Sequence, residues 1–275
     1  MLNRLFLEEK IEFVSVIDYS DCREINPRLA SRIPFKPQSV ILFLLPYYTG
    51  ETENISRYAA SVDYHIIIKR ISDKIIEKLK KIYPVSSFLP FGDHSPIDER
   101  TAAASAGLGF FGDNGLLINE KYGSYVFLAD IITDIPKEEL IGGGIRDMQA
   151  SSKSACLHCG KCQKNCPTGI LREKSGECLS AITQKKGALT PYDIELMKKV
   201  NTVWGCDICQ SVCPYNAKAK KTPVSLFYEK RIEKLDLKTL DLMSEEEFAE
   251  RAFAWRGREV PRRNLLAVEG KESKD

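Results

Sequence analysis

The apolar residues of the N-terminal half follow the spacings of strands and helices that pack around a core. Residues 12–18 and 39–44 form short apolar runs that predict strands, and the second is apolar enough to lie inside a sheet. From residue 63 to residue 82 the apolar side chains recur with helical period and Pro84 ends the run, which predicts an amphipathic helix. Residues 125–133 predict a further strand.

Glycines and polar stretches divide the chain into predicted parts. A helix that ends within residues 102–106 is closed by Gly107, and with the strands it makes an α/β (α+β) domain of residues 1–145. The glycines at 142–144 and the polar stretch 149–153 mark the end of this domain.

Two shorter parts are expected to follow. A cysteine-rich module should span residues 146–222, and a short helical C-terminal segment residues 223–275. In that segment Ser244 and Glu247 form a capping box that opens a helix. The residues from 269 onward are charged and are expected to fray.

Composition narrows the class of protein. With 275 residues, of which 43% are hydrophobic, the chain can bury a substantial core as one large domain or two small ones. The longest apolar run, residues 40–45, is too short to cross a membrane, so no membrane partner is expected. The chain carries 40 Lys and Arg against 38 Asp and Glu, so only local patches would hold a nucleic acid. With no secretory signal, the protein is expected in the cytoplasm.

Seven of the nine cysteines fall into two tight groups, and Cys178 lies between these groups. The first is a C-x2-C-x2-C-x3-C-P run from Cys156, and the second is a C-x2-C-x3-C-P run from Cys206. A 4Fe-4S cluster takes four thiolates, three from one tight loop and the fourth from elsewhere, so two clusters need eight. The first cluster is predicted to be held by Cys156, Cys159, Cys162 and Cys213, and the second by Cys166, Cys178, Cys206 and Cys209.

Other uses of these cysteines fit the spacing less well. Four-coordinate zinc does not explain evenly spaced cysteines that end in Cys-Pro twice over. Disulfides do not suit a chain of the reducing cytosol. Cys22 is expected to be a small apolar residue near a loop, and His158 an exposed loop residue and not a ligand.

Cluster cysteines alone would indicate electron transfer, but the domain before them is larger than a simple ferredoxin needs. Short motifs in that domain and in the second cysteine run have the order and spacing seen in one family: Ser56-Arg57-Tyr58-Ala59, Asp63-Tyr64-His65, Asp93-x2-Pro96-x2-Glu99-Arg100, Ala106-Gly107-Leu108-Gly109-Phe110-Phe111-Gly112, Gly123-Ser124, and Gly205-Cys206-Asp207-x-Cys209-Gln210-x-Val212-Cys213-Pro214. Over residues 37–216 the chain thereby resembles the epoxyqueuosine reductase family.

The resemblance implies a cobalamin-dependent reductase that removes the epoxide oxygen of epoxyqueuosine at the wobble position of tRNA, giving queuosine. Two 4Fe-4S clusters in a ferredoxin-like module would feed electrons to cobalamin held over the α/β domain. The partners implied are tRNA and a reduced donor such as ferredoxin or flavodoxin, and the enzyme is expected to act as a monomer.

The resemblance also implies site residues, of which the catalytic one is Asp93. Reductive cleavage of a C–O bond leaves an alkoxide, so an acid that protonates it lowers the barrier. For Asp93 to be protonated near neutral pH, its pKa must be raised by burial or by a neighbouring charge. A turn or helix-capping role before Pro96 is the alternative. The cofactor-binding residues implied are Arg57, Asp93, Arg100, Gly112, Asn114, Ser180 and Lys186.

Several of these residues have a structural alternative. Arg57 and Arg100 would equally form ion pairs with Asp63 or Glu99, and the glycines of residues 107–112 would equally serve a tight turn. His65 is not expected to be an axial cobalamin ligand, because Ile68 stands where the ligand motif Asp-x-His-x-x-Gly has glycine.

The chain also departs from the family pattern. Full-length family members often carry a C-terminal helical-repeat region that helps to hold tRNA, and this chain stops too early for it. His94, Ser95 and Asp113, with the Phe110-Phe111 pair, differ from the commoner residues at the expected rim of the site.

Local basic residues keep tRNA possible as a partner, since four arginines surround Trp255, and arginine with an aromatic ring can hold phosphates and stack an unpaired base. The four are Arg256, Arg258, Arg262 and Arg263. A solvated surface is the simpler explanation of that cluster. Two other functions stay open: an electron carrier without a substrate, and a corrinoid reductase of a small molecule.

Overall fold

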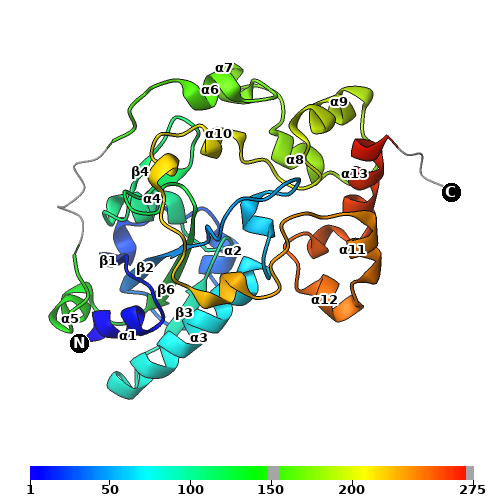
Figure 1. Ribbon diagram of the computed structural model, residues 1–275. Helices are drawn as coiled ribbons and strands as arrows, with labels where there is room; N and C mark the ends of the chain where they lie inside the picture. Colours follow the sequence, from blue (N-terminus) through cyan, green and yellow to red (C-terminus); the bar gives the residue numbers. More distant parts are fainter. Residues whose placement is uncertain (148–154, 271–275) are drawn as a thin grey trace.

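The computed structural model describes residues 1–147 and 155–270, so the polar stretch 149–153 lies outside the described residues. Its centre is a four-stranded antiparallel sheet with the strand order β1-β2-β6-β3 (Figure 1). The strands are β1 (Val14–Asp18), β2 (Ser39–Pro46), β3 (Phe88–Phe91) and β6 (Val126–Thr133). The three strands predicted from apolar runs are therefore confirmed as β1, β2 and β6.

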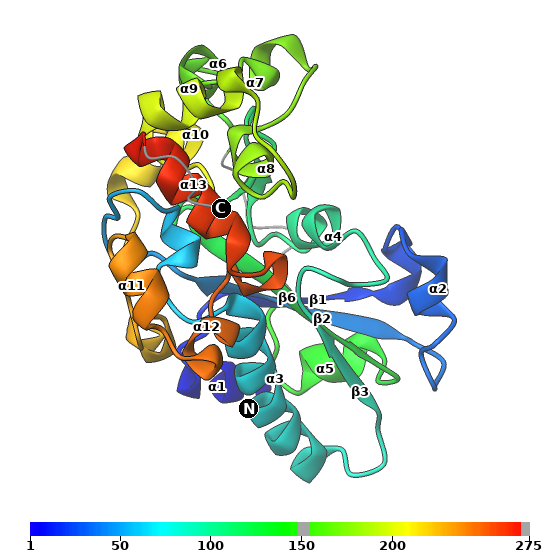
Figure 2. The same ribbon diagram turned by 90° about the vertical axis from the view of Figure 1, so that its right-hand side faces the viewer.

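Strand β2 is buried on both faces because its alternate residues point into two separate cores. Ile41 and Phe43 pack with α1 (Leu2–Glu8) and α3 (Tyr64–Ile82). Leu42 and its neighbours pack on the other face against α4 (Glu99–Ser105). The predicted amphipathic helix is thus confirmed as α3, which Figure 2 shows crossing the sheet.

The chain after α4 makes a tight turn and a short hairpin of β4 (Phe110–Phe111) and β5 (Leu117–Ile118). Gly107 has a positive φ of 76° and closes α4, as predicted. The remaining short elements of the N-terminal part are η1 (Tyr19–Asp21), α2 (Pro27–Ala30), η2 (Arg57–Ala59) and α5 (Lys137–Gly142).

The cysteine-bearing segment consists of short helices at one end of the sheet (Figure 1). It is attached there by buried hydrogen bonds, in which Tyr47 and Ser124 both donate to Gln210 Oε1, at 3.3 and 2.9 Å. Its elements are α6 (Lys161–Asn165), α7 (Ile170–Glu173), α8 (Leu179–Thr183), α9 (Pro191–Val200), α10 (Ile208–Ser211) and η3 (Asn216–Lys218).

The C-terminal helices share a core with the rest of the chain, and Figure 2 shows α12 beside α3. Trp204, fully buried, packs there with Ile55 and Phe253. The division at residues 145 and 222 stays a proposal, because all three parts contribute to this core. The elements are η4 (Ser225–Tyr228), α11 (Leu237–Leu242), α12 (Glu245–Ala249), η5 (Ala254–Arg256) and α13 (Glu259–Glu269).

Local sequence explains how two of these helices begin. Ser244 and Glu247 form the predicted capping box of α12, with both reciprocal hydrogen bonds present. Asp63 caps α3 through the backbone N–H of His65. Within the described part of the chain, no helix combines the length and the apolar character needed to cross a membrane.

We expect Gly123→Ala to destabilise the junction between the sheet and the cysteine-bearing segment by ~1–3 kcal/mol. Gly123 has a positive φ of 60°, and an added Cβ would lie 1.9 Å from Asn216 Oδ1, which accepts the Ser124 N–H. The check is a fall in the thermal unfolding midpoint. Gly142→Ala is the control, because its added Cβ would meet no described atom within 4 Å apart from its chain neighbours and the backbone of its own helix. An equal change in both variants would contradict this account of the junction.

Candidate active site

The eight cluster cysteines lie in two groups that line separate cavities. The first cavity is lined by Cys156, Cys159, Cys162 and Cys213. The second, of about 480 Å³, is lined by Cys166, Cys178, Cys206 and Cys209. Each cavity contains the same four cysteines that the count of thiolate ligands predicts. Each group draws cysteines from both runs, which begin about fifty residues apart in the sequence. The ligand roles themselves stay a prediction.

Two cysteines of the second group, Cys206 and Cys209, lie in surroundings that favour the neutral thiol. Burial raises the pKa of Cys206 to about 11 and that of Cys209 to about 12. Because a cluster ligand is a thiolate, bound iron would supply the positive charge that deprotonates these two residues. Cys22 lies apart from both groups, packed at the edge of the core under α4, as expected for a small apolar residue.

Three adjoining cavities form one cleft around Phe127, which lines all of them. Their volumes are about 650, 540 and 480 Å³. Tyr64 and Asp93 line the first and second, whereas Tyr58 and Ser180 line the second and third. The third contains the second cysteine group. The cleft therefore joins that group to Asp93.

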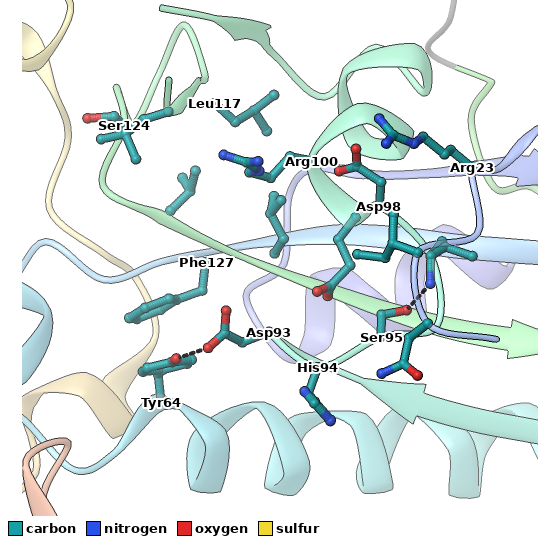
Figure 3. Close-up of a pocket in the computed structure, with 17 residues that line it drawn as sticks. Arg23, Tyr64, Asp93, His94, Ser95, Asp98, Arg100, Leu117, Ser124 and Phe127 are labelled. Carbon is teal, nitrogen blue, oxygen red and sulfur yellow. Dashed lines mark hydrogen bonds between the residues drawn. The ribbon is translucent and has the colours of Figure 1, made fainter. Parts of the chain in front are cut away.

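Asp93 lies at the centre of the cleft in the turn between β3 and α4, with a positive φ of 66°. The Tyr64 hydroxyl donates to Asp93 Oδ2 at 2.5 Å (Figure 3). His65 Nε2 lies 3.7 Å from the same oxygen. His65 and Tyr64 hold the pKa of Asp93 below its usual range, against the effect of burial. The expectation of a raised pKa is therefore wrong, because α3 brings the Tyr64 hydroxyl and the positively charged His65 to this carboxylate.

His65 carries the positive charge that balances Asp93. Its Nδ1 lies 2.8 Å from Asp63 Oδ1, and this contact, followed by that with Asp93, raises the pKa of His65 to about 9. At neutral pH the imidazole is protonated and stands between two carboxylates. The cleft thus contains a proton, and it resides on His65 and not on Asp93.

The cofactor-binding residues implied by resemblance do not all lie in the cleft. Arg100 lines the 650 Å³ cavity, and Asn114 and Ser180 line the 480 Å³ cavity. Gly112 lines the first cysteine cavity, where the space beside it is filled by Asn114 and Ile118. Lys186 is exposed in the loop after α8 and lines none of these cavities.

Arg57 forms a structural ion pair, but with different partners from the expected one. Its guanidinium lies 3.1 Å from Asp207 and also pairs with Glu51. Asp63 instead caps α3 and holds His65. Pairing of Arg100 with Glu99 is likewise absent from the described contacts, since Arg100 donates to the Gly115 carbonyl.

Three of the four arginines near Trp255 make internal bonds. Arg258 donates to the carbonyls of residues 240 and 243, Arg262 pairs with Asp241, and Arg263 donates to the carbonyl of Gly187. Arg258 and Arg262 therefore join α13 and the residue before it to α11 and its C-terminal end, whereas Arg263 joins α13 to the loop after α8.

The fourth arginine, Arg256, stacks over the Trp255 ring at 3.8 Å from its centroid. Trp255 is 59% exposed and lines the 540 Å³ cavity with Asp93. The pair therefore forms an aromatic and cationic rim at the mouth of the cleft.

His158 is exposed, as expected, and its Nδ1 contacts Asp113 Oδ1 at 2.8 Å. Reasoning from the sequence did not assign Tyr64 or Phe127 to the site. The only available signal for Tyr64 was its place inside the Asp-Tyr-His motif, and Phe127 resembles any alternating strand residue.

Comparison with protein families supports the cluster module. Residues 155–216 match the model of a 4Fe-4S double cluster binding domain, so this part of the chain is a double-cluster domain.

Curated relatives cover most of the chain. The epoxyqueuosine reductase of Lactococcus garvieae is 33% identical over 273 residues, which cover 90% of this chain and 73% of that protein. That of Bacillus subtilis is 31% identical and covers 96% of this chain and 70% of that protein. The Pseudomonas aeruginosa enzyme is 35% identical, and the chain spans only 54% of its length. The alignments with the first two enzymes extend beyond residues 37–216, the range over which the motifs indicate the family.

Solved structures of the same kind of enzyme share the fold. The epoxyqueuosine reductase of Streptococcus thermophilus matches 97% of this chain with a TM-score of 0.76 at 22% identity, over 79% of its own length. That of Bacillus subtilis matches 97% with a TM-score of 0.71 at 25% identity, over 80% of its length. The fold, the double-cluster domain and the extent of the sequence identity agree, and the chain belongs to the epoxyqueuosine reductase family.

Proposed function

We propose that this protein removes the epoxide oxygen of epoxyqueuosine at the wobble position of tRNA and gives queuosine. The observation that carries the proposal is the single cleft that joins the second cysteine group to Asp93 and His65. One structural neighbour, 23% identical with a TM-score of 0.76, is an epoxyqueuosine reductase with an epoxyqueuosine-modified stem loop of tyrosine tRNA. A pure electron carrier would need no cleft of this kind.

Cobalamin fits the middle of the cleft. Apolar walls from Tyr58, Leu116 and Phe127 suit a flat macrocycle. Asn114 Nδ2 is buried without a partner among the described residues, and an amide-rich cofactor offers an acceptor for it. Ser180 would contact the same group. When bound, cobalamin would supply a low-valent metal centre that passes electrons to the substrate.

In this proposal each of the three parts of the chain has its own role. Residues 1–145 would hold cofactor and substrate, and residues 146–222 would hold the clusters. The C-terminal part, residues 223–275, contributes Ala252 and Trp255 to one wall of the cleft. The first cysteine group includes the exposed Cys159 and lies beside the 62% exposed Leu157, so a reduced ferredoxin or flavodoxin would dock there. The protein is also proposed to act as a monomer. Oxidation-sensitive clusters suit the reducing cytoplasm.

The chain's own residues supply a proton at the site of reduction. Asp93 orients toward the cleft because Tyr64 and His65 fix its carboxylate. A proton at His65 Nε2 can pass to Asp93 and then to the oxygen released from carbon. Asp63 restrains the imidazole at Nδ1 and keeps it cationic.

The Trp255–Arg256 rim would receive the RNA. The wobble base has to leave the anticodon stack to enter the cleft, and an exposed indole with a stacked guanidinium can replace the lost stacking. Arg262 and Arg263 are less suited to this role because both make internal bonds.

We expect anaerobically reconstituted protein with cobalamin and a low-potential reductant to convert tRNA-borne epoxyqueuosine to queuosine. Asp93→Asn should lower the rate by about 100-fold or more, because it removes the group that transfers the proton. Mass spectrometry of digested nucleosides is the measurement. No conversion with corrin bound would favour a small-molecule reductase, and no corrin binding would favour an electron carrier.

We expect Asp63→Asn to move the alkaline limb of the pH profile to lower pH. In the wild type the imidazolium is lost as pH rises through about 9, the raised pKa of His65. Asparagine keeps the helix cap but removes the charge that is the first cause of this shift. Rates of conversion between pH 6 and pH 10 test the expectation. Asp73→Asn, on the exposed side of α3, is the matched control, and coincident profiles for all three proteins would refute it.

We expect Cys178→Ser to lose the second cluster and keep the first. Cys178 lies with the second cysteine group and with none of the first. Iron content should fall by up to about four per chain. Electron paramagnetic resonance of the reduced protein should keep the signal of the remaining cluster. Cys22→Ser is the control that should retain all iron, and full iron in both variants would exclude Cys178 as a ligand.

A further inference from the structure

A second carboxyl group faces the cavity beside Asp93. Glu99 is the first residue of α4 and lines the 650 Å³ cavity, and the Asp93 backbone N–H is bonded to its carboxyl. Behind it Asp130 of β6 is fully buried and accepts a hydrogen bond of 2.8 Å from the Ser95 hydroxyl. The mechanism described above uses neither Glu99 nor Asp130.

These two carboxyls lack a neutralising partner. Glu99 Oε1 and Asp130 Oδ1 are buried and have no hydrogen-bond partner among the described residues. Arg100 directs one guanidinium nitrogen to the Gly115 carbonyl. The titratable and charged side chains that face the pair or its neighbours are Asp93, Asp98, Arg23, Arg100, Tyr19, Cys22, His65 and His94.

A buried pair of this kind retains a proton at neutral pH. Burial, followed by the charges of Asp130 and Asp93, raises the pKa of Glu99 above its usual range. Burial also raises the pKa of Asp130. Two neighbouring carboxylates without a cation cannot both ionise, so the pair holds at least one proton.

The chemistry of the proposed function requires a second proton. Removal of an epoxide oxygen consumes two electrons and two protons and gives an alkene and one water. The first C–O bond breaks with its electron pair on oxygen, which takes one proton. The two added electrons then form the C=C bond as the second C–O bond breaks, and the departing hydroxide takes the other proton to become water. The Asp93 and His65 pair holds one proton only.

We propose that Glu99, backed by Asp130, holds the second proton and delivers it into the cavity beside Asp93. This inference rests on the proposed function. Glu99 is suited to the role because its carboxyl lies at the cavity wall, whereas Asp130 is enclosed and acts through Glu99.

The test uses the cluster-loaded protein and two readouts. Infrared spectra at pH 7 should show the C=O stretch of a protonated carboxyl that Glu99→Gln removes. The same variant should lower conversion of epoxyqueuosine by about 100-fold, with tRNA binding and cluster reduction unchanged. Glu195→Gln, an exposed residue of α9, is the matched control and should change neither readout.

A second variant keeps the test decisive if Glu99→Gln folds poorly. Asp130→Asn retains the contact with Ser95 but removes the neighbouring charge, so Glu99 should lose its proton at lower pH. The infrared band of the protonated carboxyl should then disappear at a lower pH than in the wild type.

Stability gives an independent check of the proton on Glu99. A carboxyl whose pKa is higher in the folded protein than in the unfolded protein destabilises the fold once the pH rises above the pKa of the unfolded state. Glu99→Gln should therefore have a higher thermal unfolding midpoint at pH 8 than the wild type.

Two results would overturn the proposal: no protonated carboxyl at pH 7 that depends on Glu99, or wild-type turnover in Glu99→Gln. If the wild-type protein itself converts no epoxyqueuosine, the proposed function fails and the delivery role fails with it. The infrared band separates the two failures, because it reports the proton on Glu99 without any substrate.

Discussion

The whole site depends on one buried carboxylate, that of Asp207 between Cys206 and Cys209. It accepts hydrogen bonds from the Ser56 hydroxyl at 2.5 Å and from the backbone and guanidinium of Arg57 at 2.7 and 3.1 Å. The Arg57 and Asp207 side chains are only 10% and 9% exposed. Loss of one partner from such a pair typically costs ~3–5 kcal/mol, because a buried charge is left unpaired. This bond fixes the second cysteine group against the sheet domain.

This junction brings the second cysteine group and the carboxyl groups that exchange protons into one cleft. Its walls hold two carboxyl groups that differ in burial and in their neighbours. Asp93 contacts a cation and a hydroxyl, so its pKa falls. Glu99 is buried beside Asp130 without a cation, so its pKa rises. The partner, and not the residue type, decides where each proton resides.

The sequence predicted the features that depend only on residues close to one another along the chain. The period of α3 and the Asp63 cap depend on residues within a few positions of one another. The same holds for the capping box of α12. Cysteine grouping could also be predicted, because each cluster has a fixed number of ligands and Cys178 alone could complete the second set. The order and spacing of short motifs sufficed to indicate the family.

Only the tertiary structure decided what each side chain does in the site. Asp93 was expected to hold a proton, yet α3 brings His65 to it and the proton lies on the imidazole. Arg57 found its partner in Asp207, 150 positions away. Trp255 reached the cleft rim through the packing of the C-terminal helices. The sequence determined the elements and the ligand count, whereas charge and protonation were decided by tertiary structure, because they depend on distances between segments that are remote along the chain and on the water excluded between them.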